Sequence, residues 1–154
     1  IPNRESALVS LRRIMESEIF ESSTAKLPLG LGVDITGKVY VADLAQMPHL
    51  LVAGSTGSGK SVCLNVIISS LLFKFSPEDV RLVLIDPKRL ELSIYARLVN
   101  HHLITLPQLN EDVITNADNA VTILKGMELE MEHRYRILAK ANVRNLDEFN
   151  RAIE

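Results

Sequence analysis

The stretch that most constrains this chain is residues 49–65, HLLVAGSTGSGKSVCLN. A short apolar run leads into a loop with three glycines, and a lysine and a serine precede a second apolar run. The loop fits the pattern G-x-x-x-x-G-K-[ST] from Gly54 to Ser61 at every fixed position. A buried strand before such a loop and a helix after it predict a phosphate-binding α/β fold, because a glycine-rich turn that binds nothing does not need this context.

The residue types of this loop suit a nucleoside triphosphate. Its glycines permit crowded backbone torsions and bring N–H groups within reach of phosphate oxygens, and the following helix directs its positive dipole end there. Lys60 can bridge the β- and γ-phosphates, and the Ser61 hydroxyl can ligate Mg²⁺. We assign the catalytic roles to Lys60 and Ser61. The predicted binding residues are Gly54, Ser55, Thr56, Gly57, Ser58, Gly59, Lys60, Ser61 and Val62.

A second apolar run, RLVLID at 81–86, ends in Asp86. It looks like a Walker B strand, but Pro87 stands where a translocating ATPase usually has its catalytic glutamate. Many such ATPases also have another strand between the P-loop strand and the Walker B strand. Asp86 should lie at the carboxyl end of a parallel strand, where ligands bind in open α/β sheets. Asp86 and Lys88 are therefore candidates for the edge of the site, with a helix-capping role for Asp86 as the alternative.

Periodicity and turn signals predict the remaining elements. In order they are a helix over 4–20 capped by Asn3, a linker over 21–28, a β-hairpin around 34–38, a strand over 49–53, a well-covered helix over 61–75, a turn over 76–80, a strand over 81–86, a helix that begins at Pro87, an irregular segment over 99–114, a long helix over 116–141 and a last helix from Asn145. The apolar stripe expected on the long helix is Ala117, Ala120, Val121, Leu124, Met127 and Met131.

Composition narrows the class of protein. The chain is 47% hydrophobic and 23% charged, which is ordinary for a globular protein, and its apolar runs are too short for a membrane span. The lone Cys63 excludes an internal disulfide. The formal net charge of -2 lacks the basic excess of a simple DNA-binding domain.

Four blocks of the sequence together resemble the FtsK/SpoIIIE family of bacterial DNA translocases. They are VADLAQMPHLLVAGSTGSGKSVCLN, VRLVLIDPKRLELSIY, MELEMEHRYRILA and VRNLDEFN. The resemblance implies an ATPase that uses ATP and Mg²⁺ and has a RecA-like parallel sheet with flanking helices. It implies a homo-oligomer, a hexameric ring around double-stranded DNA, that acts in chromosome segregation at cell division or sporulation. It also implies that the chain is a cytoplasmic domain of a membrane-anchored inner-membrane protein at the bacterial division septum.

The resemblance also implies roles for the motif residues and indicates which part of the motor core the chain holds. It implies that 54–61 is the Walker A loop and that Asp86-Pro87-Lys88 is a strand-end block, not Walker B. The Walker B acid is then expected beyond Glu154, so the chain holds an incomplete core with little hydrolysis of its own. We expect an N-terminal helix and linker at 1–28 and a partial RecA-like P-loop domain at 29–154. Segment 97–114 is longer than the link expected in this family.

Two other functions remain open from the sequence. One is the ATPase of a conjugation or type VII secretion system, because such relatives share the P-loop and a similar strand end. The other is a nucleotide-binding or oligomerisation module without motor activity, which the weak net charge fits.

Overall fold

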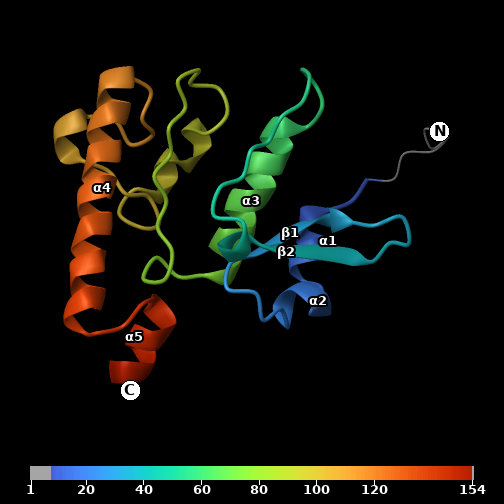
Figure 1. The fold of residues 1–154 in the computed structure, drawn as a ribbon. Coiled ribbons are helices and arrows are strands. Elements are labelled where there is room, and N and C mark those ends of the chain that lie inside the picture. Colours follow the sequence, from blue (N-terminus) through green and yellow to red (C-terminus); the bar gives the residue numbers. More distant parts are fainter. Residues whose placement is uncertain (1–7, 154) are drawn as a thin grey trace. The chain divides into compact units, whose positions relative to one another are not determined.

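The predicted β-hairpin organises the first half of the chain. In the computed structural model, which describes residues 8–153, β1 (Pro28–Val33) pairs antiparallel with β2 (Val39–Asp43) (Figure 1). The Asp34 carboxylate closes the turn by accepting hydrogen bonds from the Thr36 hydroxyl and from the N–H groups of Thr36 and Lys38. Gly37 supplies the positive φ, +83°, that the turn requires. The hairpin prediction is confirmed.

The helix predicted over 4–20 is broken in two where it is described. The two pieces are α1 (Leu11–Met15) and α2 (Glu18–Glu21), whereas Asn3 and the first predicted turn lie outside the described residues. Ser17 causes the break: its hydroxyl donates to the Ile14 carbonyl at 2.7 Å and accepts from the Phe20 N–H at 3.2 Å. A side chain that caps a new helix ends the old one.

Helix α3 (Lys60–Lys74) follows the glycine-rich loop as predicted and packs on the hairpin and α1. The helix is less buried than predicted: Ile68, Ser70 and Leu71 are buried, but the Val62 side chain is 65% exposed. The core of this part of the chain joins α1, α2 and the hairpin. It consists of Ile14, Met15 and Phe20 with Leu11, Val39 and Val41 packed against them.

The strand predicted at 49–53 is not formed. Leu51 is 90% exposed, and this segment has no ladder partner among the residues that the structure describes. An extended apolar segment becomes a strand only when a neighbour satisfies its N–H and C=O groups. The prediction was wrong because the apolar run indicates burial, whereas a strand also needs a neighbouring strand to pair with.

The segment predicted as a strand at 81–86 forms parallel bridges, Leu82 to Leu103 and Ile85 to Ile114, without a continuous strand. The Leu82 N–H donates to His102 O at 2.7 Å, and the Asp86 N–H donates to Ile114 O at 2.8 Å. Alternate residues of an extended segment point their N–H and C=O groups to the same side. Residues 82, 84 and 86 thus pair along one edge, first with 102–104 and then with 114, and 105–113 form an excursion between the two.

The helix predicted from Pro87 is instead a turn followed by a 3₁₀ helix, η2 (Ser93–Leu98). Arg89 has a positive φ of 58°, which an α-helix does not allow. Short 3₁₀ helices also occur at η1 (Leu44–Gln46) and η3 (Pro107–Leu109).

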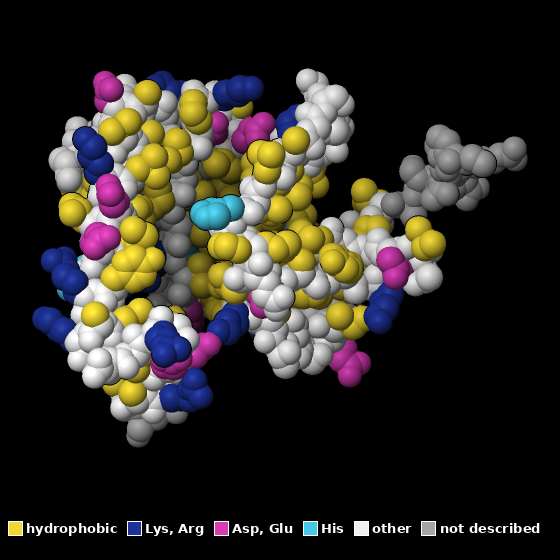
Figure 2. Space-filling view, viewed as in Figure 1, with side chains coloured by type: hydrophobic (Ala, Val, Ile, Leu, Met, Phe, Trp, Pro, Cys, Tyr) yellow, Lys and Arg dark blue, Asp and Glu magenta, His cyan; other side chains and the backbone are white. Residues whose placement is uncertain are grey.

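The long helix α4 (Ala117–Lys140) begins at the predicted place, with the Asn116 side chain as its N-cap. Its predicted stripe is wrong, because the buried residue is Ile123 and the side chains of Val121, Leu124 and Met131 are 44–55% exposed. Figure 2 shows hydrophobic side chains between charged ones over this helix. The last helix, α5 (Leu146–Ile153), follows Asn145, whose side chain accepts from the Glu148 N–H.

The α/β chain divides after Arg81 into two compact units. The first holds the hairpin, the glycine-rich loop and α3, and the second holds segment 82–86, α4 and α5. In the part that the structure describes, no helix has the length and apolar character that a bilayer crossing requires.

Candidate functional site

The glycine-rich loop lies at the free end of α3, away from the hairpin (Figure 1). Residues 54–59 are exposed, and their glycines and small polar residues give this end its mostly white surface in Figure 2. Gly57 and Gly59 have φ angles of +82° and +93°, in the left-handed region that residues with a Cβ rarely occupy. Glycine at these two positions therefore allows the backbone conformation of the loop.

Gly59 is the N-cap of α3 and offers no side-chain cap. The Cys63 N–H donates to the Gly59 carbonyl at 2.8 Å, so the helix begins its regular bonding there. The N–H groups of Gly59, Lys60, Ser61 and Val62 precede that bond and have no carbonyl of the helix to reach. An uncapped helix start with exposed amides and a positive dipole end fits a phosphate group.

The Lys60 ammonium folds back over the loop. It donates to the carbonyl oxygens of Gly54 and Ser55, the latter at 3.1 Å, and the side chain is partly exposed. These two carbonyls hold the ammonium beside the uncapped amides. A phosphate oxygen that binds those amides therefore lies within the range of the long lysine side chain.

Gly54 is required for a different reason, because the Ser58 side chain lies close to its backbone. A Cβ at this position would lie 2.2 Å from the Ser58 Oγ and 3.1 Å from its Cβ. The Ser58 N–H donates to the Ser55 carbonyl at 3.1 Å, which closes the turn between them. The loop is compact because the side chain of Ser58 occupies the space that Gly54 leaves.

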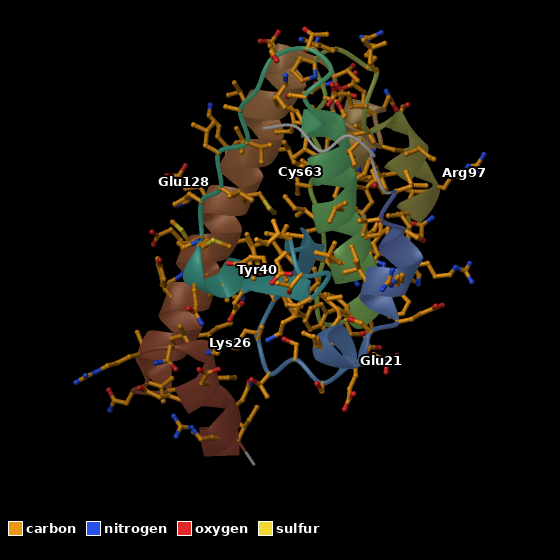
Figure 3. All side chains as sticks on the ribbon, turned by 90° about the vertical axis from the view of Figure 1, so that its right-hand side faces the viewer. Glu21, Lys26, Tyr40, Cys63, Arg97 and Glu128 are labelled. Carbon is orange, nitrogen blue, oxygen red and sulfur yellow. The ribbon has the colours of Figure 1, made fainter. Side chains whose placement is uncertain are left out.

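Ser61 offers the only protein ligand that the sequence predicts for Mg²⁺, and its side chain is partly buried in the first turn of α3. Among residues 8–153 no group of three His, Cys, Asp or Glu side chains is arranged to hold a metal ion. One hydroxyl fits a Mg²⁺ ion that takes its other ligands from phosphates and water. Cys63 follows one half-turn later, near the loop end of α3 in Figure 3.

Asp86 belongs to the second unit, where it is 6% exposed and binds the turn that follows it. Its carboxylate accepts from the N–H groups of Leu92 at 3.0 Å, Glu91 at 2.9 Å and Lys88 at 3.2 Å. These bonds, first those of Leu92 and Glu91, lower the pKa of Asp86. Asp86 thus holds a turn and caps no helix, since the 3₁₀ helix η2 has Leu92 as its N-cap without a side-chain cap, and the Lys88 side chain is exposed.

Sequence reasoning missed Glu111. Its carboxylate accepts from the Thr115 hydroxyl at 2.6 Å, from the Asn119 amide at 3.0 Å and from the Thr115 N–H at 3.1 Å. Hydrogen bonds from Thr115, then Asn119, lower its pKa to about 2. Glu111 and Asp86 both line an open cavity of about 350 Å³ in the second unit. The spacing of Glu111 and Thr115, four residues apart just before a helix N-cap, was the available signal.

Comparisons with known proteins agree with the sequence blocks. Residues 10–154 match the family model described as FtsK/SpoIIIE family. Over 153 residues the chain is 47% identical to a protein named DNA translocase FtsK from Brucella melitensis and 46% identical to one of that name from Haemophilus influenzae. A third of that name, from Chlorobaculum tepidum, is 44% identical over 155 residues.

These matches cover nearly all of this chain but a small part of each relative. The share of this chain is 99% for the Brucella and Haemophilus proteins and 100% for the Chlorobaculum protein. The shares of the relatives are 18%, 27% and 19% respectively. The chain therefore spans less than a third of the length of these relatives.

Proposed function

Because the chain belongs to the FtsK/SpoIIIE family, we propose that it is the ATP-binding part of a DNA-translocating ATPase. One observation carries this proposal: α3 begins without a side-chain cap, directly after two glycines of positive φ. The Lys60 ammonium folds back over the same loop. In the proposed complex, ATP with Mg²⁺ occupies residues 54–62. The bound nucleotide supplies the phosphoanhydride bond whose hydrolysis releases free energy for movement.

Each residue of the loop has a defined part in this proposal. The N–H groups of Gly59 to Val62 donate to phosphate oxygens, and the dipole of α3 stabilises the negative charge of the phosphates. The Lys60 ammonium leaves the carbonyls of Gly54 and Ser55 and donates to the β- and γ-phosphates. The Ser61 hydroxyl oxygen is a ligand of Mg²⁺.

The acid that activates the attacking water lies, in this proposal, outside residues 1–154. The Asp86 carboxylate supports this view, because backbone amides already use both of its oxygens. Asp86 then holds the turn that follows it, and the site-edge role of Asp86 and Lys88 stays a prediction from the sequence. The domain division is proposed as 1–28 and 29–154, with a RecA-like parallel sheet that further strands complete.

At the level of the whole protein, the proposed assembly is a membrane-anchored hexameric ring at the division septum that moves double-stranded DNA during chromosome segregation. The relatives carry the name DNA translocase, which supports this reading over a secretion ATPase or a passive nucleotide-binding module.

The test is ATP hydrolysis by the full-length protein with and without linear duplex DNA. We expect stimulation that is independent of DNA sequence and falls steeply as salt rises, because phosphate contacts release counterions. Lys60→Ala should abolish both the basal and the stimulated rate. A rate that responds to a secreted protein and not to DNA would support the secretion ATPase, and a full-length protein that binds ATP without turnover would support the passive module.

A further inference from the structure

Three side chains in the second half of α3 fasten it to α2 and the hairpin. The Lys74 ammonium donates to the Glu21 carbonyl at 2.8 Å, and the Ser70 hydroxyl contacts the backbone of β1. Phe73 meets the Phe20 ring edge-on at 6.3 Å between centroids. Glu21 lies at the end of α3 opposite Cys63 in Figure 3. The phosphate loop is thus carried on the far end of a helix that is fixed at its base.

Ser70 is the most enclosed of these contacts. Its side chain is 0% exposed, and its hydroxyl accepts from the Gly30 N–H of β1 at 3.1 Å while it donates to the Val66 carbonyl at 2.7 Å. Both hydrogen-bonding functions of the hydroxyl are therefore used. The bond to Gly30 joins residues 40 positions apart, across the interface of α3 with the hairpin.

Gly30 lies between Ser70 of α3 and the core side chains of α1 and α2. A Cβ at this position would lie 2.7 Å from the Ile14 Cγ2, 3.1 Å from the Met15 Cε and 3.3 Å from the Phe20 Cδ2. The core of α1 and α2 therefore presses on one side of this strand residue, and Ser70 binds its N–H on the other. The Gly30–Ser70 hydrogen bond consequently fixes the register of α3 along the hairpin.

We propose that Ser70 is a positioning residue for the phosphate loop, which it holds in place by anchoring α3 to Gly30. Ten residues separate Ser70 from Lys60, so the loop lies about 15 Å from the anchor along the helix axis. A small rotation or slide of α3 at the anchor displaces the uncapped amides and the Lys60 ammonium. This inference rests on the proposed nucleotide site and adds a residue that does not touch the nucleotide.

The test compares Ser70→Ala with Ile68→Val in the full-length protein. Ile68 is a buried residue of the same helix, and its loss of one methyl group weakens packing without removing the Ser70 hydroxyl. The dissociation constant for Mg·ATP, the kcat and KM for ATP and the Tm are measured for each. We expect Ser70→Ala to raise the dissociation constant about tenfold, as the loss of one buried hydrogen bond allows, whereas Ile68→Val lowers only the Tm.

Ser70→Cys keeps a small side chain with a weaker donor and acceptor and should give an intermediate dissociation constant, which serves if Ser70→Ala does not fold. Equal dissociation constants for wild type, Ser70→Cys and a folded Ser70→Ala would overturn the inference and leave Ser70 a stability residue. Wild-type protein that does not bind Mg·ATP, or binds it as well after Lys60→Ala, would instead overturn the proposed function. The two failures are therefore distinguishable.

Discussion

Gly59 and Gly126 show at the scale of one residue what glycine does in this chain. A Cβ added at either position would meet nothing within 4 Å, so space is equal at the two sites. The difference is the backbone: Gly59 has a φ of +93°, while Gly126 lies inside α4. Glycine is needed at Gly59 for its torsion and has no such role at Gly126.

Gly59→Ala should therefore destabilise the folded protein by about 1 kcal/mol, the cost of placing an L side chain in the left-handed region. It should also weaken Mg·ATP binding, since relief of this strain moves the first amides of α3. Urea unfolding and nucleotide titration measure the two effects. An unchanged affinity would show that the loop tolerates another torsion here.

Gly126→Ala is the matched control and should have the opposite sign. Alanine in a helix interior is favoured over glycine by about 0.5–1 kcal/mol, and the open space accepts the methyl group. The midpoint of urea unfolding should rise, with no effect on Mg·ATP binding. A fall in the midpoint would contradict the open surroundings described for this residue.

Glu111 predicts a dependence of stability on pH. Its folded-state pKa of about 2 lies below the ordinary value of 4.5, so its contribution is complete above pH 4.5 and is lost as the pH falls toward 2. Glu111→Gln should destabilise the protein at pH 7 and flatten this acid dependence. Urea unfolding of both proteins at pH 7, 4 and 3 measures it, and parallel curves would exclude Glu111 as the cause.

At the scale of elements, local signals were enough wherever an element closes its own hydrogen bonds. The hairpin was predicted from its turn, and α4 from a long run of apolar residues at helical spacing over 116–141. The segments 49–53 and 81–86 could not be predicted in the same way, because a parallel strand depends on partners distant in sequence. The stripe on α4 failed similarly, since periodicity reports apolar residues but not which neighbour covers them.

The cap of α4 gives a prediction for an element. The Asn116 Oδ1 accepts from the N–H groups of Asp118 at 2.7 Å and Asn119 at 3.4 Å. Asn116→Ala should reduce the free energy of unfolding by about 1 kcal/mol, whereas Asn116→Asp should retain most of it. Denaturant unfolding decides, and equal stability of the alanine variant would mean that the cap adds nothing.

At the scale of the molecule, the sequence predicted the phosphate loop better than the sheet around it. Residues 54–61 form a compact turn from local contacts, such as that between Ser55 and Ser58. A parallel sheet needs strands that this chain does not pair within residues 8–153, where the sheet is the antiparallel β1–β2 hairpin. The phosphate loop can therefore be predicted from neighbouring residues, whereas the catalytic groups that complete the site cannot.

This division predicts how residues 1–154 behave alone. We expect this fragment to bind Mg·ATP weakly and to hydrolyse little, because Asp86 is committed to its own turn. Titration with a fluorescent ATP analogue and a phosphate-release assay test both statements. Turnover typical of an intact motor, abolished by Lys60→Ala, would show that the water-activating acid lies within the fragment.

The excursion at 105–113 has a consequence for how the sequence can change. It leaves the edge of segment 82–86 after residue 104 and returns to the same edge at residue 114. Adding residues between these points leaves both pairings in register, and doubling the length of a flexible loop costs only about 0.6 kcal/mol in closure entropy. Insertions and deletions should accumulate at this position during divergence, while the hydrogen-bonded residues on either side keep their spacing to Leu82 and Asp86.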